Sequence, residues 1–314
     1  MGKQKTMKPF FVFSGQGAQA IGMGRDLAEA SPAAKAVFDE ADAVLGRPLR
    51  SVIFNGPAEE LTATRCCQTA IYTMSCAALE AFRAKYPQVK PVACAGLSLG
   101  EYAALYAAGA FSFADGLRLL AKRAELMDAA CRAASGGMAS VLGGDAEAIR
   151  RVCDACGIDV ANYNSPGQIV ISGETAKLER AVAELMAAGM RKVVVLNVAG
   201  AFHSRLMAKA GEALRPVLDA APVKMPEIPV YHNFTAAPAA DVAELRANLA
   251  SQVAGSVRWE GCVRGMIAAG GDHMIEFGPG TVLTGLLRRT LPETPYSNIN
   301  SVETWNGFET RLHQ

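Results

Sequence analysis

A Gly-Leu-Ser-Leu-Gly pentad at residues 96–100 leaves this part of the chain few choices of local structure. An apolar run, 92–95, precedes it and an alanine-rich stretch, 101–108, follows it, which predicts a strand that turns sharply into a helix. The turn uses glycines because Cβ atoms at the flanking positions would collide with neighbouring backbone. It presents Ser98 at a helix N-terminus, where free N–H groups favour a developing negative charge. We interpret Ser98 as a nucleophile, and the alternative is an ordinary glycine-rich turn.

The composition excludes several classes of protein. With 314 residues, 51% of them hydrophobic, the chain can bury a large core, and no apolar stretch reaches the length of about 20 residues that spans a membrane. A formal net charge of +1 lacks the basic excess of nucleic-acid-binding domains. The eight cysteines lack the spacing of a disulfide framework and no signal peptide precedes them, so we expect a cytoplasmic protein. Cys153 and Cys156 form a lone C-x-x-C without a second pair, so no metal site is expected.

Strand and helix patterns alternate along the first part of the chain. Such alternation predicts a mainly parallel sheet with helices on both faces, in which active sites lie at the carboxyl ends of the strands. Both Ser98 and Gln16 follow such an end. The elements expected here are strand 9–13, helices 31–45 and 67–85, and strand 92–95.

Residues 134–198 show a different order of predicted elements. The order strand, helix, strand, strand, helix, strand predicts a ferredoxin-like unit. Its expected elements are strand 138–142, helix 145–156, strands 158–162 and 168–172, helix 175–188 and strand 192–198. The fold class is therefore α/β, with an inserted α+β subdomain. We predict a large α/β-hydrolase-like catalytic domain formed by residues 7–133 and 199–314, an inserted ferredoxin-like subdomain over 134–198, and a disordered extension at 1–6.

A serine hydroxyl becomes a good nucleophile only when a base takes its proton, and histidine is the side chain best suited to this near neutral pH. His313 lies in the C-terminal tail, while His232 and His273 lie near strand ends. His203 lies where the chain crosses between the two predicted domains, a natural rim for a cleft. We therefore predict His203 as the general base for Ser98, although each histidine could instead be a hydrogen-bonded structural residue.

Arg123 lies on the apolar face of the helix expected over 115–131. Spacings of three and four residues place it among Leu119, Leu120, Leu126, Met127 and Ala130. A guanidinium on a buried face stays charged and requires an anionic partner. Because it matches a carboxylate through two parallel hydrogen bonds, Arg123 binds either an internal Asp or Glu or a carboxylate that arrives with a substrate.

The loop after the first strand has glycines on both sides of Gln16, which let backbone N–H groups approach a substrate oxygen. We predict an oxyanion hole formed by the N–H groups of Gln16 and of Leu99, the residue after the nucleophile. A phosphate-binding loop is disfavoured, because the lysine and the spacing of a P-loop are missing. The turn-rich segment that begins at Asn162 either lines the cleft or forms a plain turn.

Several segments, taken together, resemble the malonyl-CoA:acyl-carrier-protein transacylases of type II fatty acid synthesis and the related acyltransferase domains of polyketide synthases. The resemblance covers nearly the whole chain from about Met7. Each segment alone is a weak signal, whereas their order and spacing are specific. The segments are FVFSGQGAQ at 11–19, GLSLGEY at 96–102, Arg123 in its helix, NYNSPGQIVISG at 162–173, FHS at 202–204 and EFGPG at 276–280.

The resemblance implies a two-step acyl transfer. Ser98 would take the malonyl group from malonyl-CoA, with His203 as general base, and pass it to the phosphopantetheine thiol of an acyl carrier protein. Arg123 would bind the malonyl carboxylate, and a backbone carbonyl near Gln252 would orient the histidine. No permanently bound cofactor is expected, and the protein is expected to be a monomer.

Two further expectations follow from the resemblance. Phe202, directly before the histidine, goes with malonyl over methylmalonyl preference in polyketide relatives, because its bulk would crowd a branched acyl group. Carrier proteins are acidic, so basic residues near the cleft are expected to dock them. Arg191 and Lys192, at the start of the last strand of the small domain, are the candidates.

The chain departs from the family pattern at two positions. Leu97 stands where the family usually has histidine, and Ser14 where it usually has proline. Neither change removes a proposed catalytic atom, but Leu97 removes a polar group beside the nucleophile. Asp219 and Asp272 stay open as the acid of a triad. The remaining alternatives are a discrete polyketide acyltransferase, a serine thioesterase or hydrolase, and a non-catalytic docking subunit.

Overall fold

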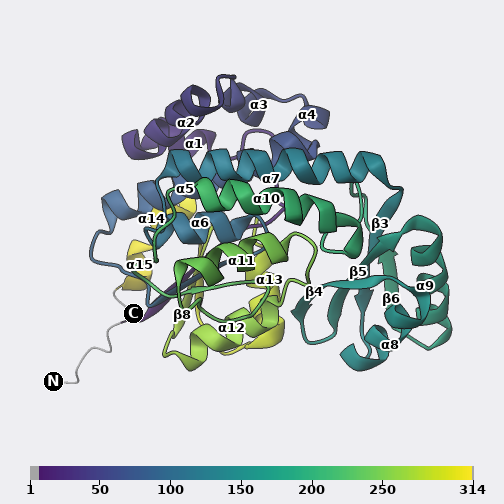
Figure 1. Cartoon of the computed structure of the whole chain (residues 1–314). Coiled ribbons are helices and arrows are strands. Elements are labelled where there is room, and N and C mark those ends of the chain that lie inside the picture. The colour runs from purple at the N-terminus through teal and green to yellow at the C-terminus, as the bar shows by residue number, and fades with distance from the viewer. Residues whose placement is uncertain (1–6, 313–314) are drawn as a thin grey trace.

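The computed structural model describes residues 7–312, so the expected extension at 1–6 and His313 lie outside the described residues. Two sheets form the frame of the molecule (Figure 1). The strands are β1 (Pro9–Phe13), β2 (Ala93–Gly96), β3 (Gly136–Leu142), β4 (Asp159–Ser165), β5 (Gln168–Glu174), β6 (Lys192–Val195), β7 (Val230–Tyr231), β8 (His273–Phe277) and β9 (Tyr296–Ile299). The helices are α1 (Arg25–Ala30), α2 (Pro32–Leu45), α3 (Leu49–Asn55), α4 (Ala58–Thr62), α5 (Thr64–Lys85), α6 (Gly100–Ala107), α7 (Phe113–Ala133), α8 (Ala146–Cys156), α9 (Thr175–Ala187), the short 3-10 helix η1 (Arg205–Met207), α10 (Ala208–Ala220), α11 (Val242–Gln252), α12 (Trp259–Ala268), α13 (Val282–Thr290), α14 (Val302–Gly307) and α15 (Glu309–Leu312).

The larger sheet has the order β7-β2-β1-β8-β9, and every neighbouring pair is parallel. Its central strand, β1, is buried along its whole length, as expected for a parallel strand covered on both faces. Phe11 and Phe13 pack towards α2, α5 and α7, whereas Phe10 and Val12 pack towards α12 and α13. Figure 1 shows α5 and α7 on one side of this sheet and α12 on the other.

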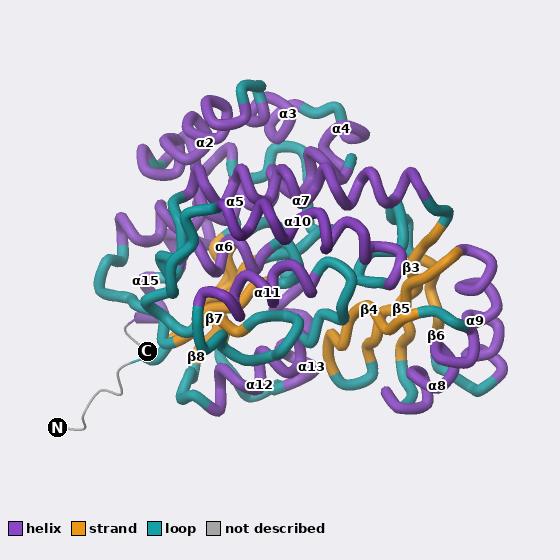
Figure 2. Tube along the Cα trace, in the orientation of Figure 1, coloured by secondary structure: helices purple, strands orange, loops and turns teal. Residues whose placement is uncertain are grey.

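The smaller sheet has the order β4-β5-β3-β6 and is antiparallel throughout, which is the strand order of a ferredoxin-like unit. Figure 2 shows α8 and α9 on its outer side. The predicted order of elements is therefore correct, although β6 ends at Val195 rather than at residue 198. After Val195 the chain keeps one strand-like hydrogen bond, from Leu196 N–H to the Met138 carbonyl, and then leaves the sheet.

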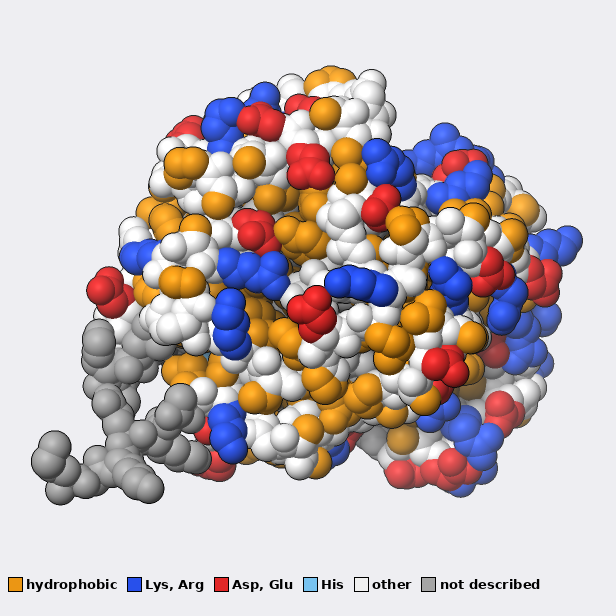
Figure 3. All heavy atoms as spheres, turned by 60° about the vertical axis from the view of Figure 1, so that its left-hand side comes forward, with side chains coloured by type: hydrophobic (Ala, Val, Ile, Leu, Met, Phe, Trp, Pro, Cys, Tyr) orange, Lys and Arg blue, Asp and Glu red, His pale blue; other side chains and the backbone are white. Residues whose placement is uncertain are grey.

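Cys153 and Cys156 both point into the core of the smaller unit. Within residues 7–312, no group of three or more His, Cys, Asp or Glu side chains is arranged to hold a metal ion. In the same residues, no helix combines the length and the apolar character that crossing a membrane requires. Acidic and basic side chains are interspersed on the face shown in Figure 3, in keeping with the net charge of +1.

The predicted turn from β2 into α6 crosses very close to β1. A Cβ atom on Gly96 would lie 2.0 Å from the carbonyl carbon and oxygen of Gly100, and one on Gly100 would lie 2.3 Å from the Phe13 carbonyl oxygen. Ser98, at the top of this turn, has a left-handed backbone with φ of 54°. Only glycine fits at 96 and 100, which explains the pentad in physical terms.

We predict that Gly96→Ala destabilises the fold by roughly 1–3 kcal/mol or more, because backbone atoms cannot yield to the added methyl group. Gly285→Ala is the matched control, since a Cβ atom there meets nothing within 4 Å on the exposed side of α13. The control should be neutral or stabilising by about 0.5–1 kcal/mol. Urea unfolding measures both, and equal stability of the two variants would contradict the tight crossing.

Candidate active site

Loops that follow three neighbouring strands meet at the carboxyl edge of the parallel sheet. Gln16 follows β1, Ser98 follows β2, and Asn233 follows β7. β2 lies on one side of β1 and β8 on the other, so the strand order reverses at β1. Such a reversal opens a crevice at the carboxyl ends of the strands, where ligands bind in α/β sheets.

Ser98 and His203 form a hydrogen-bonded pair at this edge of the sheet. The distance from Ser98 Oγ to His203 Nε2 is 2.8 Å, and His203 Nδ1 lies 2.8 Å from the backbone carbonyl oxygen of Gln252. A carbonyl only accepts, so Nδ1 carries the proton of a neutral ring and Nε2 accepts from the serine hydroxyl. Both residues have left-handed backbones, with φ of 54° and 55°, a strain typical of functional positions.

The two aspartates that the sequence left open lie elsewhere. Asp272 precedes β8 and accepts a hydrogen bond from Lys8 N–H, which places it at the amino edge of the sheet, opposite Ser98. Asp219 is exposed near the end of α10. The position of a triad acid is instead filled by the carbonyl of Gln252.

Burial lowers the pKa of His203 to about 4, and the positive charge of Arg123 contributes to the same direction. The hydrogen bond to the Gln252 carbonyl opposes this shift, because it stabilises the charged ring. His203 is therefore neutral at physiological pH. A neutral ring that accepts from Ser98 is ready to act as a base.

The side chain of Asn233 holds the turn that carries Ser98 through two hydrogen bonds. Its Oδ1 accepts from Ser98 N–H at 2.6 Å, and its Nδ2 donates to the Gly96 carbonyl at 2.8 Å. The N–H of Ser98 is thus occupied, whereas the N–H groups of Gln16 and Leu99 have no partner within residues 7–312. Leu99 is the N-cap of α6, so its free N–H lies at the positive end of a helix.

Arg123 lies beside Ser98 and is 1% exposed. Nη1 donates to Gln68 Oε1 at 2.5 Å, and Nη2 donates to Gln252 Oε1 at 2.9 Å and to Ser98 Oγ at 3.0 Å. The guanidinium also lies over the Tyr102 ring, 5.9 Å from its centroid. All three hydrogen-bond acceptors are neutral, so the internal salt bridge considered from the sequence is not the arrangement observed. A buried cation without a contacting anion suits a carboxylate that arrives from outside.

A model of the acyl transferase domain family matches residues 10–309. The chain belongs to this family. It is 45% identical over 284 residues to a malonyl CoA-acyl carrier protein transacylase of Bacillus subtilis, and the match covers 89% of each chain. The fold is similar to that of an acyl-carrier-protein S-malonyltransferase from Bartonella henselae, with a TM-score of 0.93 and 36% identity over 98% of this chain and 100% of that one. A malonyl-transacylase solved in complex with a type II PKS acyl-carrier protein gives a TM-score of 0.91 and 35% identity, covering 95% of this chain and 98% of that one.

These similarities confirm the resemblance and the fold class predicted from the sequence. Four other predicted site residues of this acyl transferase lie outside the hydrogen-bonded pair of Ser98 and His203. Phe202 is buried in the main core, and Asn162 lies on β4 where a bridge to Val257 joins the two parts of the molecule. Arg191 and Lys192 are exposed where β6 begins, at the edge of the smaller sheet. No hydrogen bond within residues 7–312 joins these four side chains to Ser98 or His203.

Four polar residues of the site were not assigned a role from the sequence. Gln68 and Asn233 contact Arg123 and Ser98, as described above, while Glu101 and His232 form a buried pair beneath the turn. Gln68 gave no detectable signal, since it lies beside Thr69 in a helix that carries several other polar residues. Asn233 and Glu101 had none, because their partners are distant in the sequence.

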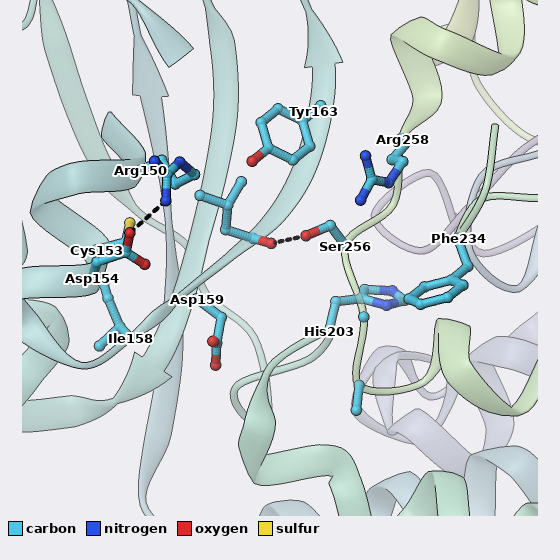
Figure 4. A pocket seen from close by; sticks show the side chains of 13 residues that line it. Arg150, Cys153, Asp154, Ile158, Asp159, Tyr163, His203, Phe234, Ser256 and Arg258 are labelled. Atoms are coloured by element: carbon cyan, nitrogen blue, oxygen red, sulfur yellow. Dashed lines mark hydrogen bonds and ion pairs between the residues drawn. The ribbon is translucent and has the colours of Figure 1, made fainter. Parts of the chain in front are cut away.

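A cavity of about 300 Å³ opens beside His203. His203, Phe234 and Arg258 line one side, and Tyr163 and Arg150 lie across it, on the smaller unit (Figure 4). Arg150 is paired with Glu147 and Asp154, whereas Arg258 forms no ion pair within residues 7–312. His203 is therefore accessible from a cavity that lies between the two parts of the molecule.

We predict that the reactivity of Ser98 towards an uncharged fluorophosphonate is flat from about pH 6 to 8 and falls only as the pH approaches the His203 pKa of about 4. Arg123→Met removes a cation that favours the neutral ring, so its acidic limb should move upwards, towards the ordinary value of 6.5. The measurement is the rate at which the probe labels Ser98, recorded as a function of pH for the unmodified protein and for Arg123→Met.

The neutral probe is used because it does not depend on Arg123 for binding.

The lowered pKa of His203 also affects stability. As the pH falls from 6.5 towards 4, the unfolded chain takes up a proton at His203 before the folded chain does, so the free energy of unfolding decreases. An acidic limb near pH 6.5 in the unmodified protein would contradict the assigned environment.

Proposed function

We propose that the protein transfers a malonyl group from malonyl-CoA to the phosphopantetheine thiol of an acyl carrier protein, through an ester on Ser98, and so supplies malonyl units for fatty acid synthesis. The observation that carries this proposal is Arg123, a buried cation with neutral partners 3.0 Å from the nucleophile. The membership of the acyl transferase family and the names of the similar proteins support it.

In the first step, Ser98 Oγ attacks the thioester carbonyl while its proton passes to His203 Nε2. The negative charge on the carbonyl oxygen is stabilised by the N–H groups of Gln16 and Leu99. The C–S bond then breaks, and the coenzyme A sulfur leaves with the proton from His203. Arg123 holds the malonyl carboxylate through paired hydrogen bonds and so fixes the carbonyl over Ser98.

In the second step, the carrier thiol gives its proton to His203 and attacks the malonyl ester. The ester C–O bond breaks, and Ser98 regains a proton from His203, so the enzyme returns to its first state. The two substrates use the same site in turn, which predicts ping-pong kinetics. Phe202 and Asn162 are assigned to the wall of the acyl site, where Phe202 favours the unbranched malonyl group.

The remaining expectations belong to the same proposal. One chain supplies every proposed site residue, which supports a monomer without a permanently bound cofactor. All eight cysteines are free, which supports a cytoplasmic location. A discrete polyketide acyltransferase is the second candidate, and the similarity to a transacylase solved with a type II PKS carrier supports it.

We predict that malonyl-CoA adds one malonyl group to Ser98 and that Arg123→Ala slows this acylation about 100-fold or more, because a charged pair worth roughly 3 kcal/mol is lost. Acylation by acetyl-CoA, which lacks the carboxylate, should be unchanged or faster in the variant. Rapid-quench intact-protein mass spectrometry measures both reactions.

Ser98→Ala is the control, and it should gain no acyl group from either thioester. A malonyl-CoA reaction that releases free malonate without loading a carrier protein would support a hydrolase instead. Equal losses on malonyl and acetyl thioesters in Arg123→Ala would exclude the carboxylate role of Arg123. A protein that never forms the adduct would be a docking subunit.

We also predict that reversing both charges, with Arg191→Glu and Lys192→Glu, raises the KM for the carrier protein by roughly tenfold, the effect of about 1.4 kcal/mol of lost attraction. The KM for malonyl-CoA should hardly change. Lys90→Glu is the matched control, since Lys90 is also exposed but precedes β2 at the opposite edge of the parallel sheet. Steady-state kinetics with each substrate varied in turn would refute this docking surface if all three proteins behaved alike.

A further inference from the structure

The charge of Arg123 is not balanced by any group that touches it. Its guanidinium is buried, its hydrogen-bond acceptors are one hydroxyl and two amide oxygens, and its Nε has no partner. No carboxylate within residues 7–312 lies within 4.0 Å of its nitrogen atoms, the distance of an ion pair. Leaving a buried cation uncompensated is costly, so the compensating charge is expected nearby.

Glu101, on the first turn of α6, is the buried carboxylate nearest along the hydrogen-bond network. It is 0% exposed. Its Oε1 lies 2.7 Å from His232 Nδ1, and its Oε2 accepts from Asn233 N–H and from Gln252 Nε2, both at 2.8 Å. Three N–H donors stabilise an ionised carboxylate.

His232 does not cancel this charge. Its Nε2 is buried and has no hydrogen-bond partner. A neutral ring with its proton on Nδ1 donates to Glu101 and leaves only an acceptor unpaired, whereas a charged ring would bury an unpaired N–H donor. The negative charge of Glu101 therefore remains available to a cation farther along the network.

Gln252 connects the two charges. Its Nε2 donates to Glu101 and to the Ser98 carbonyl, and its Oε1 accepts from Arg123 Nη2. The opposite orientation of this amide would place its NH2 group against the guanidinium, so the two charges fix one orientation. The amide dipole then points its negative end at the cation and its positive end at the anion.

We propose that Glu101 is the counter-ion of Arg123, acting through the side chain of Gln252, and that this separation keeps the guanidinium available to a substrate carboxylate. A carboxylate in direct contact would occupy the positions that the malonyl group needs. The inference rests on the proposed function for its purpose, although the coupling between Glu101 and Arg123 is a property of the free protein. Glu101 is thus a positioning residue that touches no substrate.

The arrival of a malonyl group changes the balance of charge, because the group brings an anion of its own. The free protein should depend on Glu101 more than the malonyl-bound protein does. Glu101→Gln removes the charge with little change of shape. Its amide oxygen can still accept from Asn233 and Gln252, and its NH2 can donate to His232 Nδ1 if that ring shifts its proton to Nε2.

The test is a double-mutant cycle of unfolding in urea without substrate, using Glu101→Gln, Arg123→Met and the double variant. We expect Glu101→Gln to lower the unfolding midpoint, and to lower it by less than about half as much when Arg123 is already replaced. Glu276→Gln is the matched control. Glu276 is equally buried and accepts hydrogen bonds from Leu283, Thr284 and Asn298, none of which contacts Arg123. Glu276→Gln should lower the unfolding midpoint by the same amount with and without Arg123.

A second measurement uses substrate. Saturating malonyl-CoA should raise the thermal midpoint of Glu101→Gln by more than it raises that of the unmodified protein, while acetyl-CoA should raise the two equally. The proposal would be overturned if Glu101→Gln lowered the unfolding midpoint equally with and without Arg123. It would also be overturned if malonyl-CoA raised the thermal midpoint of Glu101→Gln and of the unmodified protein equally. If Glu101→Gln does not fold, recovery of folding in the double variant supports the coupling, and its failure to recover shows that Glu101 only holds Asn233 and overturns it.

The two proposals can fail separately. An unmodified protein that forms no malonyl ester on Ser98 refutes the proposed function. The urea cycle needs no substrate, so it decides the role of Glu101 in either case.

Discussion

The close crossing of the β2–α6 turn over β1 is the constraint on which the site depends. Gly96 and Gly100 lie against each other and against β1 with no room for a side chain, and this forces Ser98 into a left-handed backbone. Asn233 then fixes the strained turn from the next strand, by bonding to the N–H of Ser98 and the carbonyl of Gly96. A strained conformation persists only where its surroundings determine it in this way. The same clamp leaves the N–H of Leu99 free for a developing charge.

The site also depends on how the charge of Arg123 is balanced. Burial lowers the pKa of His203 and the charge of Arg123 adds to that shift, while the same guanidinium is proposed to bind a carboxylate. The first effect keeps His203 neutral, and the proposed binding requires that no internal anion occupies the guanidinium. Both are met when the balancing charge of Glu101 lies one amide away, across Gln252. The backbone carbonyl of Gln252 also lies 2.8 Å from His203 Nδ1, so Gln252 is held by hydrogen bonds to four residues, Arg123, Ser98, Glu101 and His203.

Local patterns carried most of what the sequence predicted. The pentad, the apolar strands and the α-β order of the smaller unit are encoded by neighbouring residues, and they appear in the structure with bounds shifted by a few residues. The pairing of β7 with β2 was not predicted, because two residues are too short for a periodic signal. Gln68 and Asn233 act across 55 and 135 residues of sequence, a separation at which no local pattern exists. The division at residues 133–134 and 198–199 stays a prediction, as do the roles assigned to the site residues.

Leu97, where the sequence is expected to depart from the family pattern, contacts its surroundings through packing. Its side chain packs against the core on the α12 and α13 face of the sheet. The loop after β1 rests directly on it, since a Cβ atom on Gly15 would lie 2.7 Å from the Leu97 carbonyl oxygen and 3.2 Å from its Cβ. Gly15 precedes Gln16, whose N–H is proposed to bind the oxyanion. The leucine side chain offers this loop no hydrogen bond, so that side chain supports the loop only through van der Waals contact. The substitution therefore bears on the placement of an oxyanion donor rather than on the Ser98–His203 pair.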